Sequence, residues 1–194
     1  MTEDSAVRRL VMCAVAAAVI CVVAPFSIPI GAVPLSLATL AVMLAGTLTG
    51  PLGGACSTAV YLLLGLTGLP VFSGFRGGAA VLAGPTGGYL CGYPVLAAIC
   101  GLSLPLLRVV RRKRGHEPGN LTAILMIAAC AVTGTVLLYA AGTAWFCAVT
   151  GMSFSKALAV CVLPFLPGDA LKIAVCIALT LALRRRNIFK RRNS

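Results

Sequence analysis

Residues 121–149 read LTAILMIAACAVTGTVLLYAAGTAWFCAV, and no side chain in this stretch is charged. A helix of about 20 apolar residues is long enough to cross the hydrocarbon core of a bilayer. The rest of the chain has the same character, because 60% of its residues are hydrophobic and only 10% are charged. Soluble domains are closer to about 45–50% apolar and about 25% charged. The sequence therefore predicts an integral membrane protein.

Five further apolar stretches accompany this one, and charged residues or Gly and Pro separate them. The first stretch lacks a small-x-small cleavage site before a polar region, so we interpret it as a span and not as a secretory signal. The sequence predicts a single all-α membrane domain over residues 1–194, a six-transmembrane-helix bundle. Its expected spans are residues 6–24, 35–50, 52–68, 89–110, 121–149 and 168–183.

Basic residues gather in three clusters, at Arg8 and Arg9, at residues 108–114 and at residues 184–192. Six spans place all three clusters on one side of the membrane, which the positive-inside rule makes cytoplasmic. We therefore expect a multi-pass protein of the cell membrane with both termini in the cytoplasm. The net charge of +12 does not indicate nucleic acid as a partner, because the clusters flank spans. We expect membrane lipid, and not nucleic acid, to surround the chain.

Few charged residues lie outside these clusters and the segments expected in the cytoplasm: Arg76, Lys156, Asp169 and Lys172. Asp169 and Lys172 are three residues apart, so they share one face of a helix. A charged group at the centre of a membrane helix costs about 2.5–3.5 kcal/mol on insertion scales. One interpretation is an ion pair at the membrane interface whose side chains extend to water. The other, which we favour, is a polar ligand site on the extracellular half of the bundle.

Residues 68–88 are rich in Gly and Pro and yet apolar. Irregular backbone at membrane depth needs protein or a water-filled cavity to satisfy it. We therefore expect an extracellular Gly-rich loop that caps the binding site, with a plain surface loop as the alternative. No G-x-x-x-x-G-K-[ST] pattern is present, so the sequence predicts no nucleotide-hydrolysing site in this chain.

The remaining reactive residues form no recognisable catalytic or metal-binding pattern. The nine cysteines include no C-x-x-C pair and lie in apolar runs, and the single histidine, His116, lies in a charged loop. Free cysteines in such runs behave as small hydrophobic residues. We expect no cofactor, no metal and no enzymatic activity.

Four runs of residues stand in a distinctive order: VPLSLATL at 33–40, LLLGLTGLPVF at 62–72, GPTGGY at 84–89 and PGDALK at 167–172. Together they resemble the BioY family, the biotin-specific substrate-binding subunits of energy-coupling-factor transporters. The resemblance extends from about residue 7 to residue 183. It implies six helices, a vitamin bound from outside, and three partners: a transmembrane coupling subunit and two cytoplasmic ATP-binding subunits.

Biotin carries a urea ring with two N–H donors and one carbonyl acceptor, and a carboxylate tail. An ionised Asp accepts N–H bonds, whereas Lys or Arg donates to a carbonyl or carboxylate. The resemblance makes these residues substrate-binding candidates: Asp169, Lys172, Arg76, Tyr89, Thr39 and Phe75. Phe72 and Trp145 are further candidates for the apolar walls. The residues leave open which basic side chain meets which end of biotin.

Ala14 and Ala18 form a small-xxx-small motif in the first expected span. Small residues at this spacing let helices approach closely. In the resembled family such a motif is associated with docking of the coupling subunit, and internal packing is the alternative.

Two other function classes stay open. One is a self-sufficient carrier driven by protons through Asp169, and the other is a membrane enzyme or structural subunit.

Overall fold

The computed structural model describes residues 3–28, 35–114 and 119–185. Helices account for most of these residues, and a two-residue antiparallel pair, β1 (Ser27–Ile28) with β2 (Leu35–Ser36), joins the first two helices. The helices are α1 (Glu3–Val23), α2 (Ala38–Thr49), α3 (Pro51–Leu66), α4 (Ala79–Ala83), α5 (Gly87–Gly101), α6 (Ser103–Arg114), α7 (Asn120–Thr150), α8 (Phe154–Cys161), the 3₁₀ helix η1 (Leu163–Phe165) and α9 (Leu166–Arg185). His116, Val33, Pro34 and the basic residues after Arg185 lie outside the described residues.

Four stretches of the described helices are long and apolar enough to cross a membrane: Ala6–Val23, Gly87–Lys113, Asn120–Thr150 and Phe154–Leu183. Two shorter apolar helices, Ala38–Thr49 and Pro51–Leu66, accompany them. The protein is thus a predominantly helical multi-pass membrane protein. The stretch Gly87–Lys113 contains a break near Leu102, between α5 and α6. The stretch Phe154–Leu183 is made up of α8, η1 and most of α9.

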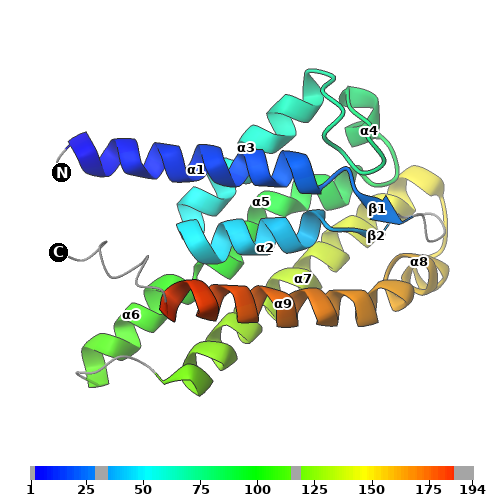
Figure 1. Ribbon diagram of the computed structural model, residues 1–194. Coiled ribbons are helices and arrows are strands. Elements are labelled where there is room, and N and C mark those ends of the chain that lie inside the picture. The colour runs from blue at the N-terminus through cyan, green and yellow to red at the C-terminus, as the bar shows by residue number, and fades with distance from the viewer. Residues whose placement is uncertain (1–2, 29–34, 115–118, 186–194) are drawn as a thin grey trace.

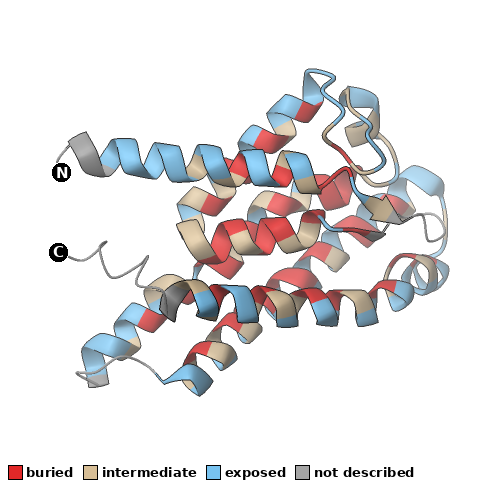
Figure 2. Ribbon diagram, in the orientation of Figure 1, coloured by how far each residue is buried: buried red, intermediate tan, exposed pale blue. Residues whose placement is uncertain are grey.

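Helix α5 lies at the centre of the bundle, where it packs against α2, α3 and α7, while α9 packs against α2 and α7 (Figure 1). Helix α1 contacts α2 and α3 and otherwise lies on the outside (Figure 2). Its outward residues are apolar, among them Leu10 at 70% exposed and Val22 at 66%. A helix with an apolar exposed face suits a lipid environment, because lipid chains solvate such side chains.

Glycines allow the central helices to approach closely. A Cβ atom on Gly46 of α2 would collide with the carbonyl oxygen of Ala97 on α5. A Cβ atom on Gly54 of α3 would lie 2.6 Å from the Cα of Gly46. The backbones of α2, α3 and α5 therefore meet at Gly46, which is the kind of contact that small residues permit between membrane helices.

The Gly-rich segment after α3 forms a tight hairpin followed by α4. The Phe72 amide donates to the Arg76 carbonyl at 2.8 Å, and the Gly74 amide donates to the Pro25 carbonyl at 2.9 Å. Between them the backbone turns through positive φ at Gly74 (71°) and Phe75 (56°). The Phe72 ring is 1% exposed and covers Gly65, where a Cβ atom would collide with it. The hairpin is thus anchored on α3 and on the end of α1.

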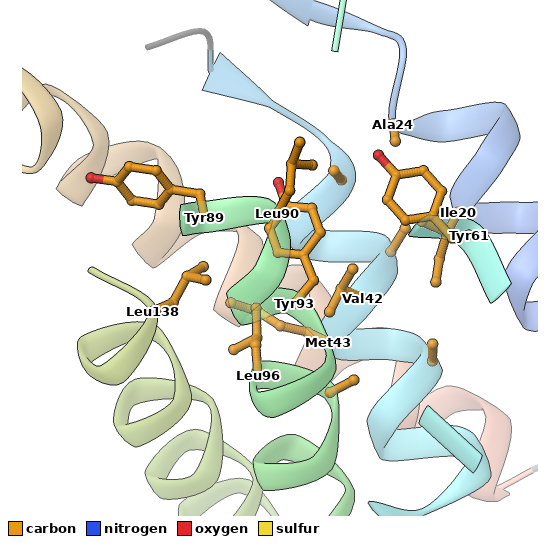
Figure 3. Close-up of a cluster of buried hydrophobic side chains, with 14 of the residues drawn as sticks. Ile20, Ala24, Val42, Met43, Tyr61, Tyr89, Leu90, Tyr93, Leu96 and Leu138 are labelled. Atoms are coloured by element: carbon orange, nitrogen blue, oxygen red, sulfur yellow. The ribbon is translucent and has the colours of Figure 1, made fainter. Parts of the chain in front are cut away.

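The short elements gather at one end of the bundle. Figure 1 shows α4, β1, β2 and α8 at the end opposite the start of α1 and the end of α9. The core beneath them is built around α5, whose Tyr89, Leu90, Tyr93 and Leu96 all belong to one buried cluster (Figure 3). The first turn of α9 begins at this same end, and it carries the charged residues described next.

Candidate functional site

Asp169 and Lys172 form a buried ion pair in the first turns of α9. Lys172 Nζ lies 2.8 Å from Asp169 Oδ1, and each residue is 7% exposed. Pro167 and Gly168 precede the pair within the same helix, because α9 begins at Leu166 directly after η1. Neither charged side chain extends out of the protein, so the pair lies within the bundle.

Two other helices contribute to this pair. Lys172 Nζ donates to the hydroxyl of Thr39 on α2 at 3.0 Å, and the hydroxyl of Tyr139 on α7 donates to Asp169 Oδ2. We call Thr39, Tyr139, Asp169 and Lys172 the polar quartet. The quartet joins α2, α7 and α9 at the end of the bundle that carries the hairpin.

Tyr139 is the member that sequence reasoning missed. A signal was present, because Tyr139 is the only tyrosine in the apolar stretch at residues 121–149. A tyrosine hydroxyl in such a span needs a hydrogen-bond partner when it is buried. The partner, Asp169, lies 30 residues further along the chain.

The quartet retains free hydrogen-bonding capacity. An ammonium group has three N–H donors, and the two described partners of Lys172 leave one of them. A carboxylate has about four lone-pair sites, so Asp169 can accept further N–H bonds beside those from Lys172 and Tyr139. The arrangement can therefore bind a molecule that offers N–H donors and an acceptor close together.

A cavity of about 520 Å³ opens beside Lys172. Its walls come from the end of α1, the start of α2, the hairpin and the start of α9, through Pro25, Phe26, Ser27, Leu37, Gly74, Phe75, Gly168, Leu171 and Lys172. Lys172 is the one charged residue among these lining residues. The rings of Phe26 and Phe75 meet edge to face with centroids 5.5 Å apart, and both side chains are more than half exposed. This is a largely apolar cavity with one cationic group in its wall.

The other predicted site residues lie in different surroundings. Phe75 lines the cavity, as just described. Arg76 is exposed, and its Nε donates to the carbonyl of Ser73 at 3.3 Å within the hairpin. Tyr89 is buried, and its hydroxyl shares a 3.2 Å hydrogen bond with Thr143 on α7. The structure therefore brings Asp169, Lys172 and Thr39 into one cluster, and gives Arg76 and Tyr89 other partners.

Phe72 and Trp145, the further wall candidates, hold the hairpin and α4 in place. Phe72 packs edge-on against Tyr61 with ring centroids 5.6 Å apart. Trp145 Nε1 donates to the carbonyl of Gly84 at 3.0 Å, just after α4. Both contacts fasten the segment between α3 and α5 to the bundle. Within the described ranges, no group of three or more His, Cys, Asp or Glu side chains is arranged to hold a metal ion.

Ala14 and Ala18 lie on the exposed side of α1, whereas Ala17 between them is 3% exposed. Internal packing of α1 thus uses Ala17 and Ile20, not the Ala14 and Ala18 pair. The small-xxx-small motif is available on the outer surface of the bundle.

Comparison with known proteins gives consistent matches along almost the whole chain. The model of the BioY family matches residues 1–188. The chain is 36% identical to the biotin transporter BioY of Rhizobium etli over 176 residues, which cover 89% of this chain and 90% of that protein. It is 34% identical to the biotin transporter BioY of Thermotoga maritima over 183 residues, covering 92% and 96%. Among solved structures, the S-component for biotin from an ECF-type ABC transporter superposes with a TM-score of 0.81 at 29% identity, covering 95% of each chain.

Proposed function

This chain belongs to the BioY family, and we propose from that premise that it binds biotin and mediates biotin uptake as the substrate-specific S subunit of an energy-coupling-factor transporter. Its relatives are biotin transporters, and its structural neighbour is a biotin S-component. Such a protein is a transporter subunit and not an enzyme. The observation that carries the proposal is the polar quartet, a buried ion pair beside an apolar cavity of about 520 Å³.

The chemistry of the site suits biotin. Ligand cavities of about 300–1,000 Å³ with mostly apolar walls and a few placed polar groups are typical of small-molecule sites. Asp169 offers carboxylate lone pairs to the urea N–H groups, and Lys172 offers an N–H to an oxygen of the ligand. The apolar walls, Phe26 and Phe75 among them, suit the thiophane ring and the alkyl tail. The proposed site thus contains Asp169, Lys172, Thr39 and Phe75, and Arg76 and Tyr89 stay predicted members, whose described hydrogen bonds go to Ser73 and Thr143.

The membrane arrangement follows from the same proposal. We take α2 and α3 as two further membrane spans beside the four longer apolar stretches, which gives six spans in total. Their expected ranges remain 6–24, 35–50, 52–68, 89–110, 121–149 and 168–183. The basic residues at the ends of α1 and α6 then face the cytoplasm, as do both termini. The hairpin and α4 lie on the extracellular side, where they cap the biotin site. The exposure of Phe75 at the cavity supports this location for the opening.

The partners of the chain are a transmembrane coupling subunit and two cytoplasmic ATP-binding subunits, which use the ATP. The chain has no P-loop pattern of its own. We assign docking of the coupling subunit to the outer face of α1 at Ala14 and Ala18. Their exposure supports this assignment, because a small-xxx-small face lets a partner helix approach the backbone closely.

An uptake assay tests the proposed function. Proteoliposomes that contain the chain with its coupling and ATP-binding subunits should accumulate radiolabelled biotin when ATP is supplied on the cytoplasmic side. Proteoliposomes with the chain alone should bind biotin but show no ATP-dependent accumulation. Accumulation by the chain alone that follows an imposed proton gradient would contradict the proposal and support a proton-coupled carrier. Absence of biotin binding by the folded chain would contradict it as well.

A further inference from the structure

Helix α6 has an apolar outer side as well as an inner side, and Figure 2 shows it exposed along much of its length. Its inner side packs on the bundle through Ser103 and Leu107, which are 1% and 5% exposed. On the outer side lie Leu102, just before the helix, Leu106 and Val109, which are 45%, 45% and 52% exposed. Residues spaced by three and four share one side of a helix. These three outer residues, which we call the apolar stripe, are placed to contact lipid chains.

A basic stripe lies beside the apolar stripe. Arg108 and Arg112 are both exposed and four residues apart, so their side chains leave the same side of α6. Consecutive residues are about 100° apart around a helix, so Arg108 lies roughly a quarter-turn from Val109 of the apolar stripe. Among the described side chains, no ion pair involves Arg108 or Arg112. Two neighbouring guanidinium groups without a carboxylate partner attract an anion.

The depth of these residues in the membrane suits a phospholipid. The apolar stretch Gly87–Lys113 has 27 residues. At about 1.5 Å per residue, it is about 10 Å longer than a hydrocarbon core of about 30 Å. All its basic residues lie in α6, so this is the end that extends beyond the core. Arg108 and Arg112, on either side of the end of the expected span at residue 110, are thus level with lipid headgroups, and the apolar stripe is level with the lipid chains.

We propose that α6 binds an anionic phospholipid, with its phosphate on Arg108 and Arg112 and one of its acyl chains along the apolar stripe. The guanidinium group suits phosphate because its N–H donors form a planar fork that matches two phosphate oxygens. A soluble phosphate would use the arginines alone, whereas a phospholipid also uses the exposed apolar side chains next to them. The membrane arrangement proposed above places this site at the cytoplasmic leaflet, where basic residues close to a span attract anionic lipids.

The test measures how tightly the detergent-solubilised chain holds lipid. Phosphatidylglycerol or phosphatidylcholine is added in increasing amounts, and native mass spectrometry counts the lipids bound to each protein. The parent should bind phosphatidylglycerol more tightly than phosphatidylcholine. The double variant Arg108→Gln with Arg112→Gln should bind phosphatidylglycerol about 30-fold more weakly, because each basic residue near the membrane surface contributes about fivefold.

The start of α1 supplies the matched control, because it lies at the same end of the bundle as α6 (Figure 1). The double variant Arg8→Gln with Arg9→Gln removes the same charge from two exposed residues, but adjacent residues do not share one side of a helix. Its affinity for phosphatidylglycerol should stay close to that of the parent. Leu106→Asn should lower that affinity, because the acyl chain loses an apolar contact. Thermal unfolding and biotin binding of each variant report whether the fold is intact.

Four results would overturn the assignment. The first is equal affinity of the parent for the two lipids, or parent-like affinity in the folded Arg108→Gln, Arg112→Gln protein. The second is an equal loss in the two double variants, which would make the effect one of overall charge. The third is displacement of the lipid by inorganic phosphate, which would make this a site for soluble anions. The fourth is unchanged lipid binding with lost co-purification of the coupling and ATP-binding subunits, which would make the basic stripe a protein interface. Failure of the parent to bind biotin refutes the proposed function instead, since lipid binding is measured without biotin.

Discussion

Substitution of Asp169 by Asn tests the site at its centre. The change keeps the shape of the side chain, removes its negative charge and turns one acceptor into a donor. Asp169 accepts hydrogen bonds from Lys172 and Tyr139 in the structure, and we propose that it also accepts them from biotin. A hydrogen bond to a charged group contributes about 1.5–3 kcal/mol. Since about 1.4 kcal/mol corresponds to tenfold in affinity, we expect biotin affinity to fall by about 10- to 100-fold.

Asp169→Asn also affects stability, and this must be separated from binding. It leaves the ammonium group of Lys172 buried without its counter-charge, and breaking a buried ion pair from one side costs about 3–5 kcal/mol. Lys172→Met leaves the carboxylate unpaired in the same way. In the double variant Asp169→Asn with Lys172→Met neither charge remains, so thermal stability should recover toward that of the parent, while biotin affinity stays low.

Calorimetry in nanodiscs gives the affinities, and thermal unfolding gives the stabilities of the parent, both single variants and the double variant. Coupled residues give non-additive losses, which this set of four proteins measures directly. Lys156→Met is the matched control, because Lys156 is exposed on α8 and should change neither quantity. If Asp169→Asn protein binds biotin as tightly as the parent, or if the double variant regains affinity together with stability, the pair is structural and our site assignment is wrong.

Two further substitutions test docking and packing. Ala18→Leu should reduce co-purification of the chain with its coupling subunit while biotin affinity stays unchanged, because the larger side chain prevents close approach on the outer face of α1. The exposed Ala129 on α7 gives the control, and equal yields for Ala18→Leu and Ala129→Leu would move docking away from α1. Gly46→Ala should destabilise the protein by about 1–3 kcal/mol in thermal unfolding, because its Cβ atom collides with the Ala97 backbone. Gly119→Ala meets open space and should be tolerated, so equal effects of the two would contradict the packing argument.

The sequence predicts the features of the fold that depend on local composition. Apolar runs such as residues 121–149 predict long helices because lipid leaves the backbone no other way to pair its polar groups. Local spacing also predicts that Asp169 and Lys172 share one face of a helix, because residues three apart are neighbours on the helix surface. The ion pair at 2.8 Å agrees with that expectation.

The partners of the ion pair could not be derived from local sequence. Thr39 lies 133 residues before Lys172, and Tyr139 lies 30 residues before Asp169, so both contacts depend on how α2 and α7 pack on α9. The resemblance to a known family suggested Thr39, but nothing in the local pattern singled out Tyr139. Arg76 stays a predicted ligand residue, and its one described side-chain hydrogen bond goes to Ser73 in its own hairpin. An isolated charge in a loop has solvent available, and the buried pair in α9 does not.

Stability alone does not account for the polar quartet. Removing two charges from water costs several kcal/mol for each ion, and well-packed apolar residues of similar volume often stabilise a protein more than a buried ion pair does. Thr39, Tyr139, Asp169 and Lys172 nevertheless occupy the inner faces of three helices, where apolar side chains would join α2, α7 and α9 at least as well. We propose that a ligand with matching N–H and oxygen groups completes the arrangement. An analogue that lacks one of those groups leaves a buried partner unpaired at a cost of about 1–3 kcal/mol. On this proposal, the buried charges provide selectivity for one ligand and not additional stability of the protein without ligand.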